Sequence, residues 1–332
     1  EYLDGTSVDT RRAWRKHKTY VFKDETNPDG TFKNWNPSGS SDFNWANPSS
    51  QAIPWLRTGE IMRYDRYSKA LEERGIDDVY ASVKMGYDQT LPIITATPAR
   101  YVEFAYSGAE DHMGSVNYFG GEGRGPSASA LDNTRAHTGE YSVRLNASTR
   151  YGMNYQIYVG PYFDTPIGNQ IARQKYEARV WIHEDNISTG FNYLYCNYKD
   201  FNNNSLLWQG AKISDATTIK AGEWYMIRLP IDLTLSSLAN CIKIDIGTWV
   251  PSIAGNTYFD DFRFAPVEAA VTSYVYDLKT DRVTYVLDQE HLYTQYEYDQ
   301  AGRLTRVYRE TTDNPTGKRL VSESEYHYKR PF

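Results

Sequence analysis

The sequence contains no apolar run close to the roughly 18 to 20 residues of a membrane-spanning helix, so we predict no transmembrane span. Only two cysteines, Cys196 and Cys241, occur in 332 residues, which is too few for a disulfide-stabilised scaffold. Their spacing leaves open whether they form one bridge in an oxidising compartment or remain two buried thiols. With 36 basic and 42 acidic residues the net charge is -6, which gives no electrostatic signature of nucleic-acid binding.

Motifs of the common catalytic sites are also missing. The six histidines lack metal-ligand spacing, and the chain has no nucleophile elbow, no P-loop and no Cys–His context. The glycine-rich stretch 120–125 lacks the Lys-Ser/Thr ending and the helix that would hold a phosphate, so we interpret it as a connection between strands. Paired carboxylates at 110–111, 184–185 and 260–261 would suit a glycosidase, but solvated or structural roles explain them better. We predict that the protein is not an enzyme.

The start and end of the chain lack the features of a complete product. The sequence does not begin with Met, and no charged-then-apolar stretch is typical of a signal peptide. It ends shortly after a strand-like segment at Tyr326–Lys329. We expect an excised or processed piece of a longer protein, so the missing targeting segment says nothing about location.

Tyrosine, in contrast, is abundant: the chain has 29 Tyr and 12 Phe. Tyrosine favours pleated, half-exposed surfaces, where its ring packs and its hydroxyl stays hydrated. Hydrophobic residues make up 40% of the chain and charged residues 23%, enough apolar material to bury a core. The composition predicts a β-rich protein with large sheet faces.

Tyr-Asp pairs recur at similar intervals. Those at 64–65 and 87–88 are 23 residues apart, and those at 276–277 and 298–299 are 22 apart. Such recurrence indicates a repeat, here a β-hairpin with an Asp-x-x-Gly turn. The segment 296–305, YEYDQAGRLT, resembles the YD repeat of the RHS family.

This resemblance implies β-hairpins of the kind that large secreted or surface proteins use in β-ribbons. Segment 64–72 resembles a degenerate copy in which Ser-Lys replaces the turn glycine. The resemblance covers only about a third of the chain, too few hairpins to close an encapsulating shell.

The stretch 107–266 has a different sequence pattern from the hairpin segments on either side of it. Period-2 strands bounded by turn residues follow one another without a helical segment, as in an all-β sandwich. Three landmarks, 136–145 (AHTGEYSVRL), 176–182 (YEARVWI) and 258–262 (YFDDF), resemble carbohydrate-binding modules of the galactose-binding-like jelly-roll type. We predict an all-β fold, with a β-sandwich jelly roll flanked by YD-repeat-type hairpins.

Four regions follow from these patterns: an Asn/Pro/Trp-rich segment at 1–56, a degenerate YD-type hairpin region at 57–106, the jelly roll at 107–266 and YD-repeat hairpins at 267–332. The arrangement resembles the large YD-repeat surface proteins of Bacteroidetes-type bacteria. That resemblance implies a cell-surface or secreted location, at the outer-membrane exterior.

Strand alternation sorts side chains that could meet a sugar. Aromatic rings cover the C–H faces of sugars, and amides or carboxylates bond the hydroxyls. Alternation gives strand 191–198 an aromatic face, and it gives strand 242–249 a polar face opposite three isoleucines. The predicted sugar face comprises Tyr193, Tyr195, Trp208, Trp249 and Asp245. The alternative is that these rings only pack against neighbouring hairpins, and we assign Trp181 and Trp224 to the core.

A structural calcium is implied by the same resemblance. In such modules an acidic lead-in residue and the first Asp of the closing pair help to hold the ion, which prefers hard oxygen ligands. The corresponding residues here are Glu110, Asp111 and Asp260. We expect Phe259 and Phe262 to face the core.

Three functions remain open on the sequence. The first is non-catalytic recognition of a glycan or surface polysaccharide, with a role in adhesion. The second is an architectural spacer without sugar binding. The third is a processed fragment held by outer-membrane or secretion-machinery proteins through β-edge and tyrosine contacts.

Overall fold

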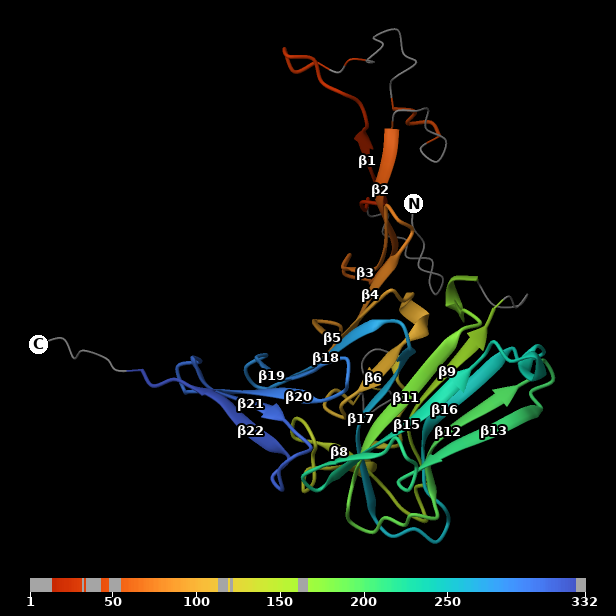
Figure 1. Cartoon of the computed structure of the whole chain (residues 1–332), viewed down its shortest axis with the longest axis vertical. Coiled ribbons are helices and arrows are strands. Elements are labelled where there is room, and N and C mark those ends of the chain that lie inside the picture. Colours follow the sequence, from red (N-terminus) through yellow and green to blue (C-terminus); the bar gives the residue numbers. More distant parts are fainter. Residues whose placement is uncertain are drawn as a thin grey trace, which may run out of the picture. The chain divides into compact units, whose positions relative to one another are not determined.

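The computed structural model describes residues 14–31, 33, 43–47, 55–112, 119, 122–160 and 167–326. Contacts divide the chain into two compact units, Glu1–Ser82 and Val83–Phe332, and most of their strands are labelled in Figure 1. Much of the predicted segment 1–56 lies outside the described residues.

The regular structure within these ranges consists of β-strands and single-turn 3₁₀ helices, with no α-helix. The all-β prediction is therefore confirmed. The same ranges contain no helix long and apolar enough to span a membrane.

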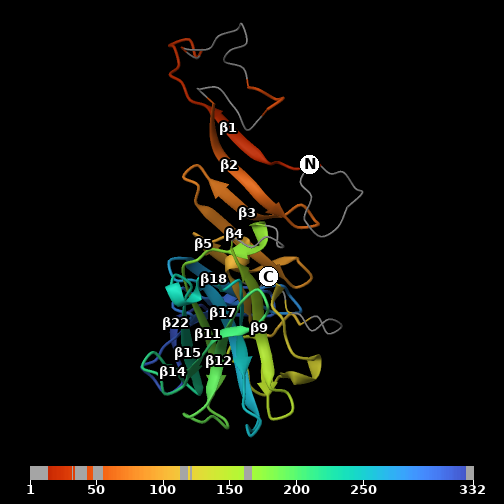
Figure 2. The ribbon, with the colours of Figure 1, turned by 90° about the vertical axis from the view of Figure 1, so that its right-hand side faces the viewer.

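The first unit is an antiparallel ladder of strands (Figure 2). It contains one buried carboxylate, Glu60. Glu60 accepts hydrogen bonds from Arg57 and Arg74. Burial opposes its ionisation, but these two guanidiniums and the charge of Lys18 outweigh burial and lower the pKa of Glu60 to about 2. The strands are β1 (Lys18–Phe22), β2 (Trp55–Tyr64), β3 (Ala70–Gly75) and the start of β4 (Tyr80–Gly86).

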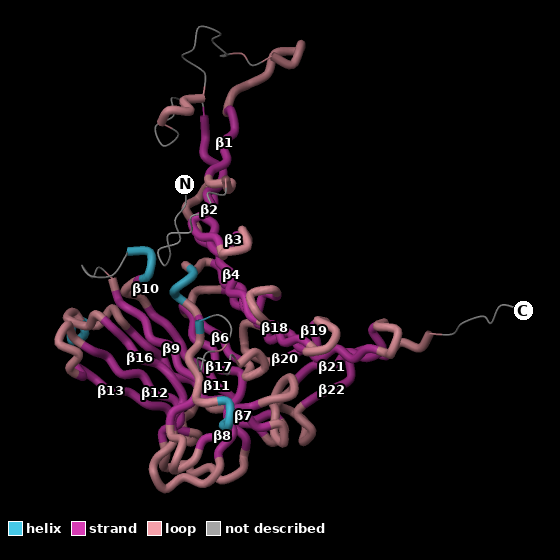
Figure 3. The backbone as a smooth tube through the Cα atoms, turned by 180° about the vertical axis from the view of Figure 1, so that it is seen from behind, coloured by secondary structure: helices cyan, strands magenta, loops and turns pink. Residues whose placement is uncertain are grey.

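The second unit contains a β-sandwich of jelly-roll type. One sheet has the order β10-β9-β16-β12-β13, and Figure 3 shows β9, β16, β12 and β13 side by side. These strands are β9 (Tyr151–Val159), β10 (Gln170–Ile171), β12 (Asn192–Lys199), β13 (Ser205–Lys212) and β16 (Lys243–Trp249).

The facing sheet has the order β14-β15-β11-β17-β8-β7, and β6 also pairs with β17. Its strands are β6 (Ala105–Ser107), β7 (Leu131–Asp132), β8 (Ser142–Leu145), β11 (Lys175–His183), β14 (Ile219–Ala221), β15 (Trp224–Asp232) and β17 (Thr257–Pro266).

The core between the two sheets follows from period-2 alternation. On β16, Ile244 and Ile246 are fully buried, while the residues between them face outward. Phe259 and Phe262 are buried, as predicted. Trp181 and Trp224 are also buried, but in a separate cluster with Ala221 and Met226, against which Leu292 packs. Cys196 and Cys241 are both buried and unbridged, so the open question about the cysteines is answered in favour of free thiols.

The remaining strands form antiparallel hairpins in the order β5-β18-β19-β20-β21-β22. Tyr-Asp pairs end strands here for a local reason, which is that the aspartate closes the turn. Asp299 Oδ1 accepts the backbone N–H groups of Ala301 and Arg303, and Gly302 takes the left-handed conformation with φ 80°. The strands are β5 (Leu91–Thr97), β18 (Ala270–Tyr276), β19 (Val283–Leu287), β20 (Tyr293–Tyr298), β21 (Leu304–Glu310) and β22 (Lys318–Glu323).

Asp65 makes the same turn in the first unit. Its Oδ1 accepts the N–H groups of Tyr67 and Lys69, and Ser68 adopts φ 69° where Gly302 stands in the other copy. The degenerate segment 64–72 therefore has the local geometry of the 296–305 hairpin, although Ser lacks glycine's freedom at positive φ.

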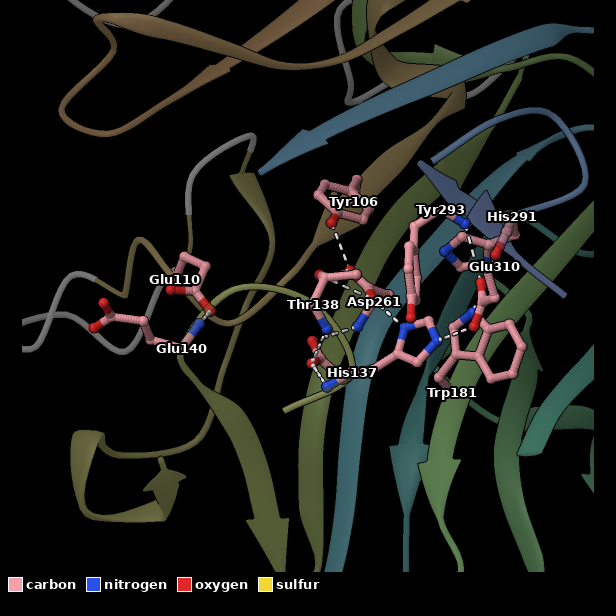
Figure 4. Close-up of polar contacts among 11 residues, drawn as sticks. Tyr106, Glu110, His137, Thr138, Glu140, Trp181, Asp261, His291, Tyr293 and Glu310 are labelled. Atoms are coloured by element: carbon pink, nitrogen blue, oxygen red, sulfur yellow. Dashed lines mark hydrogen bonds and ion pairs between the residues drawn. The ribbon is translucent and has the colours of Figure 1, made fainter. Parts of the chain in front are cut away.

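A buried ion cluster joins the sandwich to the C-terminal hairpins (Figure 4). His137 bonds Asp261 of β17 through Nδ1 and Glu310 of β21 through Nε2, both at 2.7 Å, and its ring stacks on Trp181. Burial alone would lower the pKa of His137, but the charge of Glu310 and the two hydrogen bonds outweigh it and raise the pKa to about 10. These buried ion pairs, which we call the His137 cluster, connect the sandwich to the C-terminal hairpins.

We predict that Glu310→Ala lowers the free energy of unfolding by about 3 to 5 kcal/mol, because it leaves a buried imidazolium with one partner fewer. Because the pKa of His137 is raised from 6.5 to about 10, the stabilisation is complete below pH 6.5 and is lost as the pH rises towards 10. Thermal and denaturant unfolding across this pH range measure both effects.

The matched control is Glu323→Ala, which removes a surface pair with Arg306 in the same hairpin. It should leave unfolding unchanged at every pH. Equal destabilisation by the two variants would contradict a stabilising role of the His137 cluster.

Candidate functional site

The candidate site lies on the outer face of the sheet β10-β9-β16-β12-β13, opposite the core. Cross-strand partners share a face, so the strand register places side chains in rows. One row runs Gln156, Asp245, Asn197 and Trp208 across four strands. The next runs Asn154, Gly247, Tyr195 and Gly210.

Two glycines hollow this face on either side of Tyr195. A Cβ on Gly247 would lie 2.5 Å from the Cβ of Asn154, and one on Gly210 would lie 2.7 Å from the Trp208 ring. The face is therefore a cleft of about 590 Å³. It is lined by Arg124, Tyr151, Asn154, Gln156, Tyr195, Asn197, Lys199, Trp208, Asp245 and Trp249.

Aromatic rings form the walls of the cleft. Trp208 and Trp249 meet edge to face with centroids 6.4 Å apart, and Tyr151 meets Tyr195 in the same way at 6.1 Å. The guanidinium of Arg150 lies over the Trp249 ring, 5.1 Å from its centroid, which helps to fix the plane of the indole. Trp208 is 46% exposed and Tyr151 59%, so these rings are available to a ligand.

The centre of the cleft holds a fixed polar group. Asp245 accepts a hydrogen bond from Gln156 Nε2 at 2.6 Å and pairs with Lys199 Nζ at 2.5 Å. Gln156 and Lys199 keep further N–H donors, and the amide of Gln156 keeps its oxygen as an acceptor. Burial raises the pKa of the Tyr195 hydroxyl, so this group remains a neutral donor.

The structure brings four of the five predicted sugar-face residues together: Tyr195, Trp208, Trp249 and Asp245 all line the cleft. Tyr193 does not. The register of β12 against β13 shifts between Asn192 and Leu194, and Tyr193 turns inward, where it is fully buried and accepts a hydrogen bond from the N–H of Ser188.

Several cleft residues were not among the predicted sugar-face residues. Alternation does place Asn154, Gln156 and Asn197 on outward faces, and that pattern was the available signal. Strict alternation puts Tyr151 with the core residues of its strand, but a register shift next to Trp249 turns it outward. Arg124 lies outside the regular strands, between β6 and β7, and reaches the cleft because it forms an isolated bridge with Asn154.

The three residues predicted for calcium do not form a ligand set in the described part of the chain. Asp260 accepts N–H groups through both oxygens, from His137 and Thr138 at Oδ2 and from Asp261 at Oδ1. Asp111 accepts the N–H of Tyr87. Among the described residues no group of three or more His, Cys, Asp or Glu side chains is placed to hold a metal.

Glu110 carries a buried oxygen that fits a cation. Its Oε1 accepts two backbone N–H groups, and its Oε2 is buried without a hydrogen-bond partner. Burial raises the pKa of Glu110 to about 8, so the carboxyl is largely protonated at neutral pH. The calcium stays a prediction, which the donor set of the described residues does not support.

We predict that Glu110→Gln unfolds at the same temperature as the parent chain at pH 4.5 and below and at a higher temperature at pH 7, because only the parent must protonate on folding a carboxyl that is ionised in the unfolded chain. The parent chain should lose stability as the pH rises from 4.5 to about 8, and the variant should lose less. Calorimetry with and without chelator checks this. A chelator-induced drop in the parent together with a destabilised variant would instead establish the calcium.

Comparison with known proteins returned structures alone. No family model and no curated protein matches the sequence. The C-terminal family 22 carbohydrate-binding module of Clostridium thermocellum Xyn10B is similar with 16% identity and a TM-score of 0.28, over 51% of this chain and 97% of that one.

Two further structures are similar at the same level. Caldicellulosiruptor saccharolyticus CBM27-1, in complex with mannohexaose, has 11% identity and a TM-score of 0.24, over 50% of this chain and 91% of that one. The K3 cleaved adhesin domain of Lys-gingipain from Porphyromonas gingivalis has 10% identity and a TM-score of 0.23, over 55% of this chain and 98% of that one. At these identities and TM-scores none of the three bears on function.

Proposed function

We propose that the protein is a non-catalytic glycan-binding protein and that the outer face of the sheet β10-β9-β16-β12-β13 is its binding site. The carrying observation is that Tyr151, Tyr195, Trp208 and Trp249 surround a fixed polar group in one cleft. This combination matches the two faces of a sugar, since rings cover its C–H groups and amides bond its hydroxyls.

The dimensions and rigidity of the cleft support the proposal. Its volume of about 590 Å³ falls within the range of about 300 to 1,000 Å³ typical of ligand sites. Regular strands carry most of the lining residues, and Asp245 is already held by Gln156 and Lys199. A site ordered in advance loses little conformational entropy when a ligand binds.

The wider biological role is part of the same proposal. The hairpins closed by Asp65 and Asp299 support a surface or secreted protein of the RHS/YD-repeat kind, in which the sandwich would serve adhesion. A spacer without sugar binding, or a fragment retained by outer-membrane or secretion-machinery proteins, is the alternative if the cleft binds no glycan.

We predict that the whole chain binds at least one member of an array of plant and bacterial oligosaccharides, and that Trp249→Ala weakens this binding at least about 10-fold. Loss of a stacking ring removes apolar contact between the wall of the cleft and the sugar. Array screening followed by calorimetric titration of the best-bound oligosaccharide measures the effect.

The control is Trp45→Ala, which removes an indole that is 83% exposed in the first unit. It should bind like the parent chain. A folded Trp249→Ala variant with unchanged affinity, or a folded parent chain that binds nothing on the array, would refute the proposed site.

A further inference from the structure

The charges around the cleft are unevenly distributed. Arg124 and Lys199 line it together with one carboxylate, Asp245. Lys243 lies directly opposite Lys199 on the neighbouring strand and therefore shares its face. Arg124, Lys199 and Lys243 thus place three cationic side chains near one carboxylate on this face, although the whole chain has a net charge of -6.

Asp245, the single carboxylate that lines the cleft, already has partners. Asp245 pairs with Lys199 and accepts the Gln156 amide, so it neutralises one lysine and no other cation. Within the described residues, the side chains of Arg124 and Lys243 make no hydrogen bond or ion pair with another residue. Two cationic groups therefore remain free to meet a ligand.

The cross-strand pairing of Lys199 with Lys243 is electrostatically unfavourable to folding. Like charges directly opposite each other in a sheet are destabilising. Lys199 is compensated by Asp245, whereas Lys243 adds uncompensated positive charge beside it. An anion bound next to Lys243 would remove this repulsion, which gives the arrangement a binding role.

The position of Lys243 fits a substituent on the same chain of sugars. It precedes Asp245 by two residues on β16, about 7 Å further along the strand, and Trp249 lies at the opposite end of that strand. A glycan that stacks on the tryptophans and extends along β16 would reach Lys243 at one end, while Arg124 approaches from the side of β9.

We propose that the cleft selects glycans that carry anionic substituents, carboxylate or sulfate groups, which Arg124 and Lys243 bind at two separate positions along the sugar chain. This inference rests on the proposed glycan binding and adds the class of ligand. Charge-assisted hydrogen bonds from these two groups discriminate against the matched neutral sugar. Because both cations are at least partly exposed to solvent, the preference should weaken as salt increases.

The test uses the whole chain and two matched pairs of oligosaccharides. The carboxylate arm compares oligogalacturonides with their methyl esters, and the sulfate arm compares carrageenan oligosaccharides with the same oligosaccharides after desulfation. We expect the acidic member of at least one pair to bind about 10-fold more tightly in low salt, and the ratio to fall in 0.5 M NaCl, where the Debye length is a few Å. The arm that shows the preference identifies the anion.

Variants then locate the charge effect. Lys243→Gln, which lies outside the residues that line the cleft, should reduce the acid-to-neutral ratio several-fold and leave binding of the neutral member within about twofold. Arg124→Gln should also reduce the ratio several-fold. Lys279→Gln, which removes the same charge from an exposed turn between β18 and β19, should change neither value.

The outcomes separate this inference from the proposed function. Equal affinity for the members of each pair, or a preference that survives both Lys243→Gln and Arg124→Gln, overturns the anionic selectivity while Trp249-dependent binding of neutral glycans still stands. If no glycan on the array is bound, both proposals fail together.

Discussion

The burial of Ile244 and Ile246 between the two sheets is the constraint on which the cleft depends. These side chains are fully inside the sandwich, and alternation then sends Asp245, Gly247 and Trp249 to the outer face. A slip of one residue would exchange the two sets and expose isoleucine. The packing of the two isoleucines in the core therefore also sets the orientation of Asp245, Gly247 and Trp249 on the outer face.

A second constraint operates at the other sheet, where buried charge takes the place of apolar contact. Asp261 has φ 50° at a bulge in β17, so the side chains of two consecutive aspartates, Asp260 and Asp261, can both be buried beside the turn that begins at Ala136. The backbone of this turn satisfies Asp260, and the imidazolium of His137 links Asp261 to Glu310. A buried charge is tolerated only when it is paired. The stability of the sandwich therefore depends on its contact with the C-terminal hairpins at this cluster.

Much of this architecture can be predicted from sequence because it rests on local pattern. Period-2 alternation gives the strands, the inward isoleucines and the outward Asp245 and Trp249 correctly. It fails at Tyr193 and Tyr151, where register shifts insert an extra residue and reverse the side chains. Bulges depend on how two distant strands pair, which one strand's own sequence does not contain.

The contacts across long sequence separations could not be predicted for the same reason. The landmark at 136–145 is recognisable, but its role becomes clear only when His137 meets Asp261 and Glu310, which are 124 and 173 residues away. Arg124 likewise enters the cleft through one bridge to Asn154. The aspartate turns at 65 and 299 were predictable because their hydrogen bonds close within four residues.

The central claim is that a glycan binds on the outer face of the sheet that contains β16. The most direct measurement is NMR of the tryptophan indole N–H signals during titration with the best-bound oligosaccharide of the array. The account predicts that the signals of Trp208 and Trp249 shift with saturation while that of the buried Trp181 stays in place, because Trp181 donates to the carbonyl of His291 away from the cleft. Saturable binding that leaves Trp208 and Trp249 unshifted would contradict it.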